Sequence, residues 1–292
     1  MGRISKKLSK MIRSSRKRKV VRLRDYAKGK HLLNDSKNDV KDVKELVENG
    51  YDPLHAVYLS AQNLVSVLSE FLSDLPLFKD YYDKADYAED EYLPGGPPMS
   101  PLTSSYFTTW AFFDLQFGGD NETIGTCILD ASNELKLSSD MVEVIRLFQN
   151  SRMGIFSHCG RDGHNVVLRE LVSEEEFSCH VASRYSGKKK QLWFVRRLPP
   201  LKDNFDYSVI FTTPYVLPGN SKREWQAYMD RTLPKTGISD KREALHQLMK
   251  FGLESNYWNE YIFLAYHHFQ HDAIFLSGIP DVKESLPHAD LT

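Results

Sequence analysis

The chain contains 292 residues, of which 41% are hydrophobic, 12% aromatic and 26% charged, and its formal net charge is −1. These values are typical of globular proteins and exclude collagen-like, low-complexity and wholly disordered chains. At this length the chain can form one large domain or two ordinary ones, and either arrangement buries a sizeable core.

The cysteines and the N-terminus carry no sign of secretion. The chain has three cysteines, at positions 127, 159 and 179. The disulfide framework of a secreted protein of this length needs more cysteines, and an even number of them. The N-terminus is basic but lacks the apolar stretch of roughly 7–15 residues that a signal peptide needs. The longest uncharged run of the aromatic-rich middle, residues 102–113, is shorter than the roughly 18 residues of a transmembrane helix. The sequence therefore predicts a cytoplasmic protein without a transmembrane segment.

The near-neutral total hides a strongly asymmetric charge distribution. Residues 1–30 contain thirteen Lys and Arg residues against one acid, Asp25, so this segment carries +12 and the rest of the chain −13. A block of like charge repels itself and buries little apolar surface. We therefore expect residues 1–35 to form a mobile basic tail.

Three roles for this basic tail follow from its chemistry. It can bind a polyanion such as RNA, DNA or the ribosome, because each neutralised phosphate releases counterions. The residues that we assign to this contact are Arg16, Lys17, Arg18, Lys19, Arg22 and Arg24. As a basic amphipathic helix it can lie on an anionic membrane, or it can fold back on its own acidic body. No aromatic residue precedes Tyr26, so we expect binding without base stacking or sequence preference.

The segment that follows, residues 36–150, is predicted to be helical. A short helix is expected over residues 36–49, with Gly50 at its C-terminal cap. The clearest helix of the chain starts after Asp52, which suits an N-cap, and Pro53, which suits a first turn. Its apolar residues recur at helical spacing, which indicates a face buried in the core.

Two polar segments interrupt this helical portion. Acids alternate with tyrosines over residues 74–92, and we expect this segment at the surface, where it could dock the basic tail or a protein partner. Residues 94–101 are rich in Pro and Gly and are predicted to form a loop.

Beyond residue 150 the apolar period changes from 3.6 to 2. Five short runs then read as strands: residues 153–158, 165–172, 177–182, 192–198 and 207–213. They predict a β-meander or a small β-barrel over residues 151–217. In the last portion, residues 218–292, helices are expected over residues 221–232, 240–251 and 255–271. Because β and α segments do not alternate, the predicted fold class is α+β, with helical N- and C-terminal portions around the strands.

The middle of the chain contains three characteristic segments: Ser100-Pro101-Leu102-Thr103, Trp110-Ala111-Phe112-Phe113-Asp114, and Ser151-Arg152-Met153-Gly154 with His158-Cys159-Gly160 after it. Together they resemble bacterial proteins of an uncharacterised family, over about the middle half of the chain. This resemblance implies no known activity and transfers no catalytic residue.

A group of histidines and cysteines is the first candidate for chemistry: His158, Cys159, His164 and His180, with Cys179 alongside. Zn²⁺ takes four N or S ligands, usually from closely spaced pairs. Two such pairs, His158-Cys159 and Cys179-His180, lie about twenty residues apart in the sequence. One observation argues against a zinc site. Side chains alternate along a strand, so Cys179 should face inward and His180 outward, and both cannot bind one ion without a bulge. Zn²⁺ is thus a candidate cofactor, and a Cys159–His164 nucleophile pair stays open as well.

Two further groups could hold metal. His267 and His271 are four residues apart in the predicted helix 255–271, a spacing that lets two imidazoles share an ion. The H-E-x-x-H motif fails because His268 stands in the Glu position. A nuclease-like Mg²⁺ site could use three acids: Asp114, Glu122 and Asp130.

The strand region also offers a binding face. Three lysines, residues 188–190, precede the run Leu192-Trp193-Phe194-Val195-Arg196-Arg197. Basic side chains beside a Trp on a barrel strand are typical of a nucleic-acid-binding face, and we assign Lys189, Trp193 and Arg196 to it. Alternatively, the lysines form an ordinary hairpin tip and the arginines pair with acids of the body.

The sequence thus favours a non-enzymatic binding protein whose basic tail engages a polyanion and which needs no cofactor. It leaves two alternatives open, a metal-dependent hydrolase or nuclease that uses the His/Cys group, and a scaffold that binds a protein through residues 74–92. An enzymatic activity is neither established nor excluded by these motifs.

Overall fold

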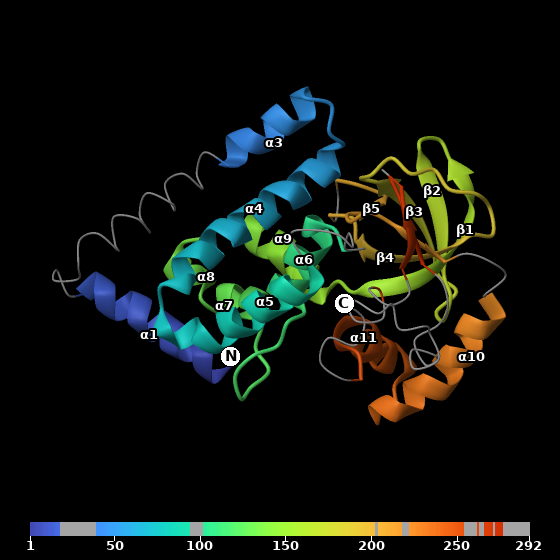
Figure 1. Ribbon diagram of the computed structural model, residues 1–292. Coiled ribbons are helices and arrows are strands. Elements are labelled where there is room, and N and C mark those ends of the chain that lie inside the picture. The colour runs from blue at the N-terminus through green and yellow to red at the C-terminus, as the bar shows by residue number, and fades with distance from the viewer. Residues whose placement is uncertain are drawn as a thin grey trace. The chain divides into compact units, whose positions relative to one another are not determined.

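The computed structural model describes residues 1–17, 39–93, 102–201, 204–217, 222–253, 262, 266–270 and 272–276. They form two compact units (Figure 1). The first comprises Met1–Glu89 and Thr108–Asn150, and the second comprises Asp90–Phe107 and Ser151–Thr292. The predicted Pro/Gly loop 94–101 lies outside the described residues.

Up to residue 150 the chain is helical. Its elements are α1 (Arg3–Lys17), α3 (Asp39–Glu48), α4 (Pro53–Ser73), η1 (Pro76–Phe78), α5 (Lys79–Tyr92), α6 (Ser104–Phe113), α7 (Ile124–Asp130), α8 (Ser132–Leu135) and α9 (Ser139–Asn150). Helix α4 begins as predicted, because the Asp52 carboxylate accepts a hydrogen bond from the backbone N–H of His55 at 3.0 Å and Pro53 follows it. Its apolar face is buried, and Tyr58 packs edge-on against Phe148 of α9. None of the helices within the described ranges is both long and apolar enough to span a membrane.

The five predicted strands are present in the second unit: β1 (Met153–Asp162), β2 (Asn165–Glu170), β3 (Glu176–Val181), β4 (Leu192–Leu198) and β5 (Ser208–Ile210). Strand β1 pairs antiparallel with both β2 and β4. Strand β3 pairs antiparallel with β2 and parallel with β5, and β5 pairs antiparallel with β4. The order β1-β2-β3-β5-β4 therefore returns to β1, and the strands close into a small barrel (Figure 1). The α+β class and the barrel that the sequence predicts are both confirmed.

One irregularity in β1 decides where its last residues face. The pairing of β1 with β2 is regular up to His158, which lies opposite Leu168. The next β2 residue, Val167, lies opposite Gly160, so Cys159 has no partner in β2 and forms a bulge. Gly160 has φ +140°, a conformation that L-residues rarely adopt. The bulge shifts the alternation of side chains by one position from there to the end of β1.

The sheet continues beyond the barrel through β6 (Tyr215–Leu217), β8 (Ile274–Leu276) and β7 (Tyr266–Phe269), in that order. The helices α10 (Lys222–Thr232), η2 (Leu233–Thr236) and α11 (Lys241–Phe251) precede the last two strands in the chain. The predicted helix over residues 255–271 is therefore wrong for Tyr266–Phe269, which pair antiparallel with β8. This short run is rich in aromatic residues that also favour strands, and pairing with β8 decides its conformation.

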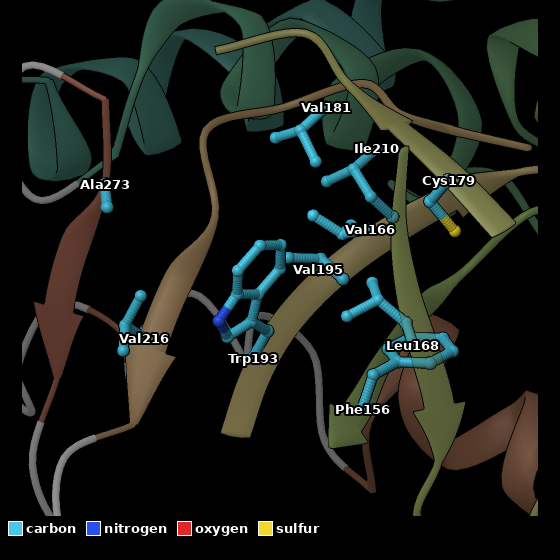
Figure 2. Packing of buried hydrophobic residues seen from close by; sticks show 10 residues of the cluster. All are labelled: Phe156, Val166, Leu168, Cys179, Val181, Trp193, Val195, Ile210, Val216 and Ala273. Carbon is cyan, nitrogen blue, oxygen red and sulfur yellow. The ribbon is translucent and has the colours of Figure 1, made fainter. Parts of the chain in front are cut away.

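An apolar core fills the barrel and continues to β6 and to the residue before β8. Its buried members are Phe156, Val166, Leu168, Cys179, Val181, Trp193, Val195, Ile210, Val216 and Ala273. Figure 2 shows the Trp193 ring among the inward-pointing side chains of neighbouring strands. Cys179 faces this core and His180 does not, as strand alternation predicts.

Two neighbouring valines of β2 provide a matched test of this inside–outside alternation. Val166 is buried in the barrel core, whereas Val167 is half-buried on the other face. Val166→Ala should lower the free energy of unfolding by about 2 kcal/mol, because it removes buried apolar volume and leaves a cavity. Val167→Ala makes the same chemical change and should cost less than half as much. Urea denaturation followed by tryptophan fluorescence measures both, and equal losses would contradict the register.

Candidate functional site

The first half of the predicted basic tail is a helix packed on the body. Residues 3–17 form α1, in which the side chains of Ser5 and Leu8 have no exposed surface. The expectation of a mobile tail thus does not hold for residues 3–17, because the apolar side of this amphipathic helix finds a surface to cover. Residues 18–35, the second half of the predicted tail, lie outside the described residues.

A single carboxylate caps the start of α1. Glu122 accepts hydrogen bonds from the backbone N–H groups of Ile4 and Ser5, both at 2.9 Å, and from the Ser5 hydroxyl. Burial raises the pKa of Glu122, but the hydrogen bonds from Ser5 and Ile4 outweigh it and hold the pKa below its ordinary value. A carboxylate at this position satisfies N–H groups that have no helical partner and complements the helix dipole.

Further acids of the first unit hold other parts of α1. Arg3 Nε lies 3.0 Å from Asp120 Oδ1, and Arg13 Nε donates to Glu134 Oε1 at 2.6 Å. The N-terminal ammonium lies 3.8 Å from Asp130. Of the three acids considered for Mg²⁺, Glu122 therefore contacts α1 and Asp130 contacts the N-terminal ammonium before it.

The acidic segment that was expected to dock the tail has another arrangement. Three of its four tyrosines pack inward to different degrees, Tyr81 and Tyr92 being buried and Tyr82 half-buried. Tyr87 is the exposed one. The acids that contact α1 come instead from α8 and from the turn before α7. Docking of the remaining tail, residues 18–35, on this segment lies outside the described residues.

The outward side of α1 is basic and exposed. Lys6, Lys7 and Lys10 are exposed, and none of them forms an ion pair with a described residue. We call these three residues the α1 basic face. Arg16 and Lys17 lie in the last turn of the same helix, whereas Arg18, Lys19, Arg22 and Arg24 lie outside the described residues. Leu8 is buried under the helix and Ile4 and Ile12 are half-buried, so much of the apolar side of α1 already contacts the body, whereas Met11 is exposed.

The binding face predicted on β4 is partly wrong. Trp193 is fully buried in the barrel core, and Arg196 is 2% exposed, with its guanidinium donating to Ser151 Oγ at 3.0 Å. Neither side chain can meet a macromolecule at the surface. The combination of basic residues and a Trp does not mark a surface here, because β4 packs on both faces, as its burial pattern shows. Lys189, in contrast, is exposed in the connection between β3 and β4.

The His/Cys group is spread over several environments. His158 is buried against the Trp193 ring, with centroids 5.2 Å apart, and its Nε2 donates to the carbonyl of Ser186 at 3.0 Å. Cys159 is the bulge residue, and His164 is exposed at the β1–β2 turn. His180 lies on β3, which β2 separates from β1 in the sheet.

These ligand candidates consequently do not meet. In the part of the chain that the structure describes, no three His, Cys, Asp or Glu residues form a group that could hold a metal ion. His267 belongs to strand β7, so the helical spacing that joined it to His271 does not apply, and His271 lies outside the described residues.

His158 makes the stability of the second unit depend on pH. Burial lowers the pKa of this imidazole, and the charges of Arg161 and Lys189 lower it further. The unfolded chain therefore binds a proton more readily than the folded one, and the free energy of unfolding should fall as the pH drops below about 6.5. His158→Gln keeps a donor for the Ser186 carbonyl but cannot titrate. Urea denaturation between pH 5 and 7.5 should show a shallower pH dependence for this variant than for wild type, and identical profiles would count against the assignment.

Removal of the charge on Glu122 should loosen α1. In Glu122→Gln the helix loses its anionic cap, so amide protection of Ile4 and Ser5 in hydrogen exchange should fall by about fivefold to tenfold, equivalent to about 1 kcal/mol. In wild type the same loss should appear on acidification from about pH 4.5 downward, because a lowered carboxyl pKa stabilises the folded state only while the group is ionised. Glu143→Gln changes an exposed acid of α9 and serves as the control. Protection in Glu122→Gln equal to that of the control would refute the capping role.

No protein-family model, curated protein or solved structure matches this chain. The resemblance to an uncharacterised bacterial family therefore stays a prediction.

Proposed function

We propose that this protein binds nucleic acid through the α1 basic face and through the basic run that continues in the sequence to residue 30. The observation that carries the proposal is the division of roles along α1. Acids of the body hold Arg3 and Arg13, whereas Lys6, Lys7 and Lys10 are exposed without an ion pair among the described residues. The body thus holds the helix through Arg3 and Arg13 and forms no ion pair with these three lysines among the described residues.

The ligand follows from the chemistry of these side chains. A lysine ammonium is a compact point charge that binds phosphate without a demand for planar geometry. Each phosphate that a lysine neutralises releases counterions, which favours binding at low salt whatever the base sequence. The lack of any aromatic residue before Tyr26 supports contact with the phosphate backbone rather than stacking on bases.

Docking of α1 also favours binding energetically. A free basic segment must lose backbone and side-chain freedom when it binds, and that loss weakens the complex. Helix α1 is already ordered by the Glu122 cap and by burial of Leu8. Its three lysines lie within five residues on the outer side of one helix, where they can meet neighbouring phosphates together.

The test replaces Lys6, Lys7 and Lys10 together with Gln in the full-length protein. Binding to a fluorescently labelled 20-base-pair duplex is followed by anisotropy at several salt concentrations. Loss of three phosphate contacts should weaken binding and lower the slope of log K against log salt concentration by roughly 2–3, at about 0.9 per contact. The control replaces Lys44, Lys79 and Lys136, which are also exposed and belong to the same unit. Equal affinity and equal slope for the two variants would overturn the proposal.

A further inference from the structure

A second group of basic residues lies in the connection between β3 and β4, on a turn that is held in one conformation. The side-chain oxygen of Gln191 accepts hydrogen bonds from the backbone N–H of Lys188 at 2.7 Å and from Trp193 Nε1 at 3.4 Å. The Tyr185 hydroxyl donates to the same oxygen at 3.3 Å. Gln191 thereby ties residues 188–190 to the fully buried Trp193 of the barrel core.

The turn is also attached to the end of β1. The backbone N–H of Lys190 donates to the carbonyl of His158 at 2.9 Å, and the N–H of His158 donates to the carbonyl of Gln191 at 2.9 Å. Lys190 has φ +73°, in the left-handed region that few non-glycine residues occupy. Such a backbone conformation persists only where the surroundings fix it, and it is common at binding sites.

The bulge in β1 brings a fourth basic residue to this place. Because of the extra residue Cys159, Arg161 lies opposite Val166, just as His158 lies opposite Leu168. Directly opposed residues share a face of the sheet, so Arg161 follows His158 on the face that bears the core residues, and not the outer face. Val166 and Leu168 are both core residues, but Arg161 is exposed because it stands at the end of the barrel.

The glycine of the bulge makes room for one of the lysines. A Cβ at Gly160 would lie 2.8 Å from Lys189 Cε, so the absence of a side chain lets the Lys189 stem pass close to β1. Gly160 directly precedes Arg161 in β1, so the Lys189 stem passes beside the backbone next to Arg161. Both charges also lower the pKa of His158, after the larger effect of its burial. The two basic groups are therefore neighbours although 28 residues separate them in the sequence.

The positive charges of this group are not compensated locally. Lys188, Lys189, Lys190 and Arg161 are all exposed, and none forms an ion pair with any residue of the described ranges. Like charges held together repel each other, and a bound anion relieves that repulsion. We call these four residues the barrel basic cluster.

We infer that the barrel basic cluster is a second nucleic-acid contact, which binds the phosphate backbone independently of the α1 basic face. For its class of ligand this inference rests on the proposed function. The aromatic side chains beside the cluster, Trp193 and Tyr185, are respectively buried and half-buried and hydrogen-bonded to Gln191. The cluster thus offers charge and no exposed ring for stacking, so its binding is independent of base sequence and sensitive to salt.

The experiment replaces Lys188, Lys189 and Lys190 together with Gln in the full-length protein. Affinity for the labelled 20-base-pair duplex is measured at four salt concentrations, as for the α1 variant. We expect at least tenfold weaker binding near 100 mM salt and a slope lower by roughly 2–3. Arg161→Gln alone should lower the slope by about 1. A triple replacement of Lys222, Lys235 and Lys241, exposed residues of the same unit, is the matched control.

The two surfaces are distinguishable in this design. If the cluster variant binds like its control while the α1 variant is weakened, the inference about the barrel is overturned and the proposed function stands. If only the cluster variant is weakened, the role of α1 is overturned and the barrel contact stands. A wild-type protein that does not bind the duplex at low salt overturns both. Unchanged urea midpoints, read from tryptophan fluorescence, show that each variant is folded.

Discussion

Strand β1 pairs with β4 over Met153–Ser157 and with β2 over Phe156–Asp162, and the second unit depends on this double pairing. It joins the first and fourth strands, closes the sheet and encloses the core around Trp193 (Figure 2). Closure also removes the free edges that an open five-stranded sheet would expose. Since β1 continues past its last β4 partner, residues 158–161 lie beside the β3–β4 connection, and the barrel basic cluster forms there.

The two basic surfaces are held in place by different kinds of contact. In the first unit Glu122, Asp120 and Glu134 contact α1, so some charges of the basic segment are neutralised inside the molecule. In the second unit the lysine turn is ordered by neutral groups, chiefly the amide oxygen of Gln191. Order without neutralisation leaves the charges available to a ligand. The formal net charge of −1 gives no hint of this division, because it sums over both arrangements.

Local patterns made the fold predictable, and long-range contacts limited the prediction of the site. Period-two alternation located the five barrel strands, and Asp52 with Pro53 located the start of α4. The docking of α1 depends on Glu122, more than 110 residues away, and charge counting alone favoured a free tail. Trp193 was assigned to the surface because basic residues flank it, and this local pattern did not show that its strand is buried on both faces. The bulge that determines on which face Arg161 lies had one signal in the sequence, a glycine, Gly160, near the predicted end of a strand.

The docking of α1 also determines the chemistry of a thiol. Cys127 Sγ lies 3.6 Å from the Ser5 hydroxyl and 3.8 Å from Glu122, and burial raises its pKa to about 12. A thiol in this state holds almost no thiolate at neutral pH and is inert toward alkylating reagents. It becomes reactive when α1 leaves the body and water enters. In a protein whose Cys159 has been replaced, the alkylation rate of Cys127 therefore measures how often α1 detaches from the body. A nucleic acid bound to this helix would change that rate.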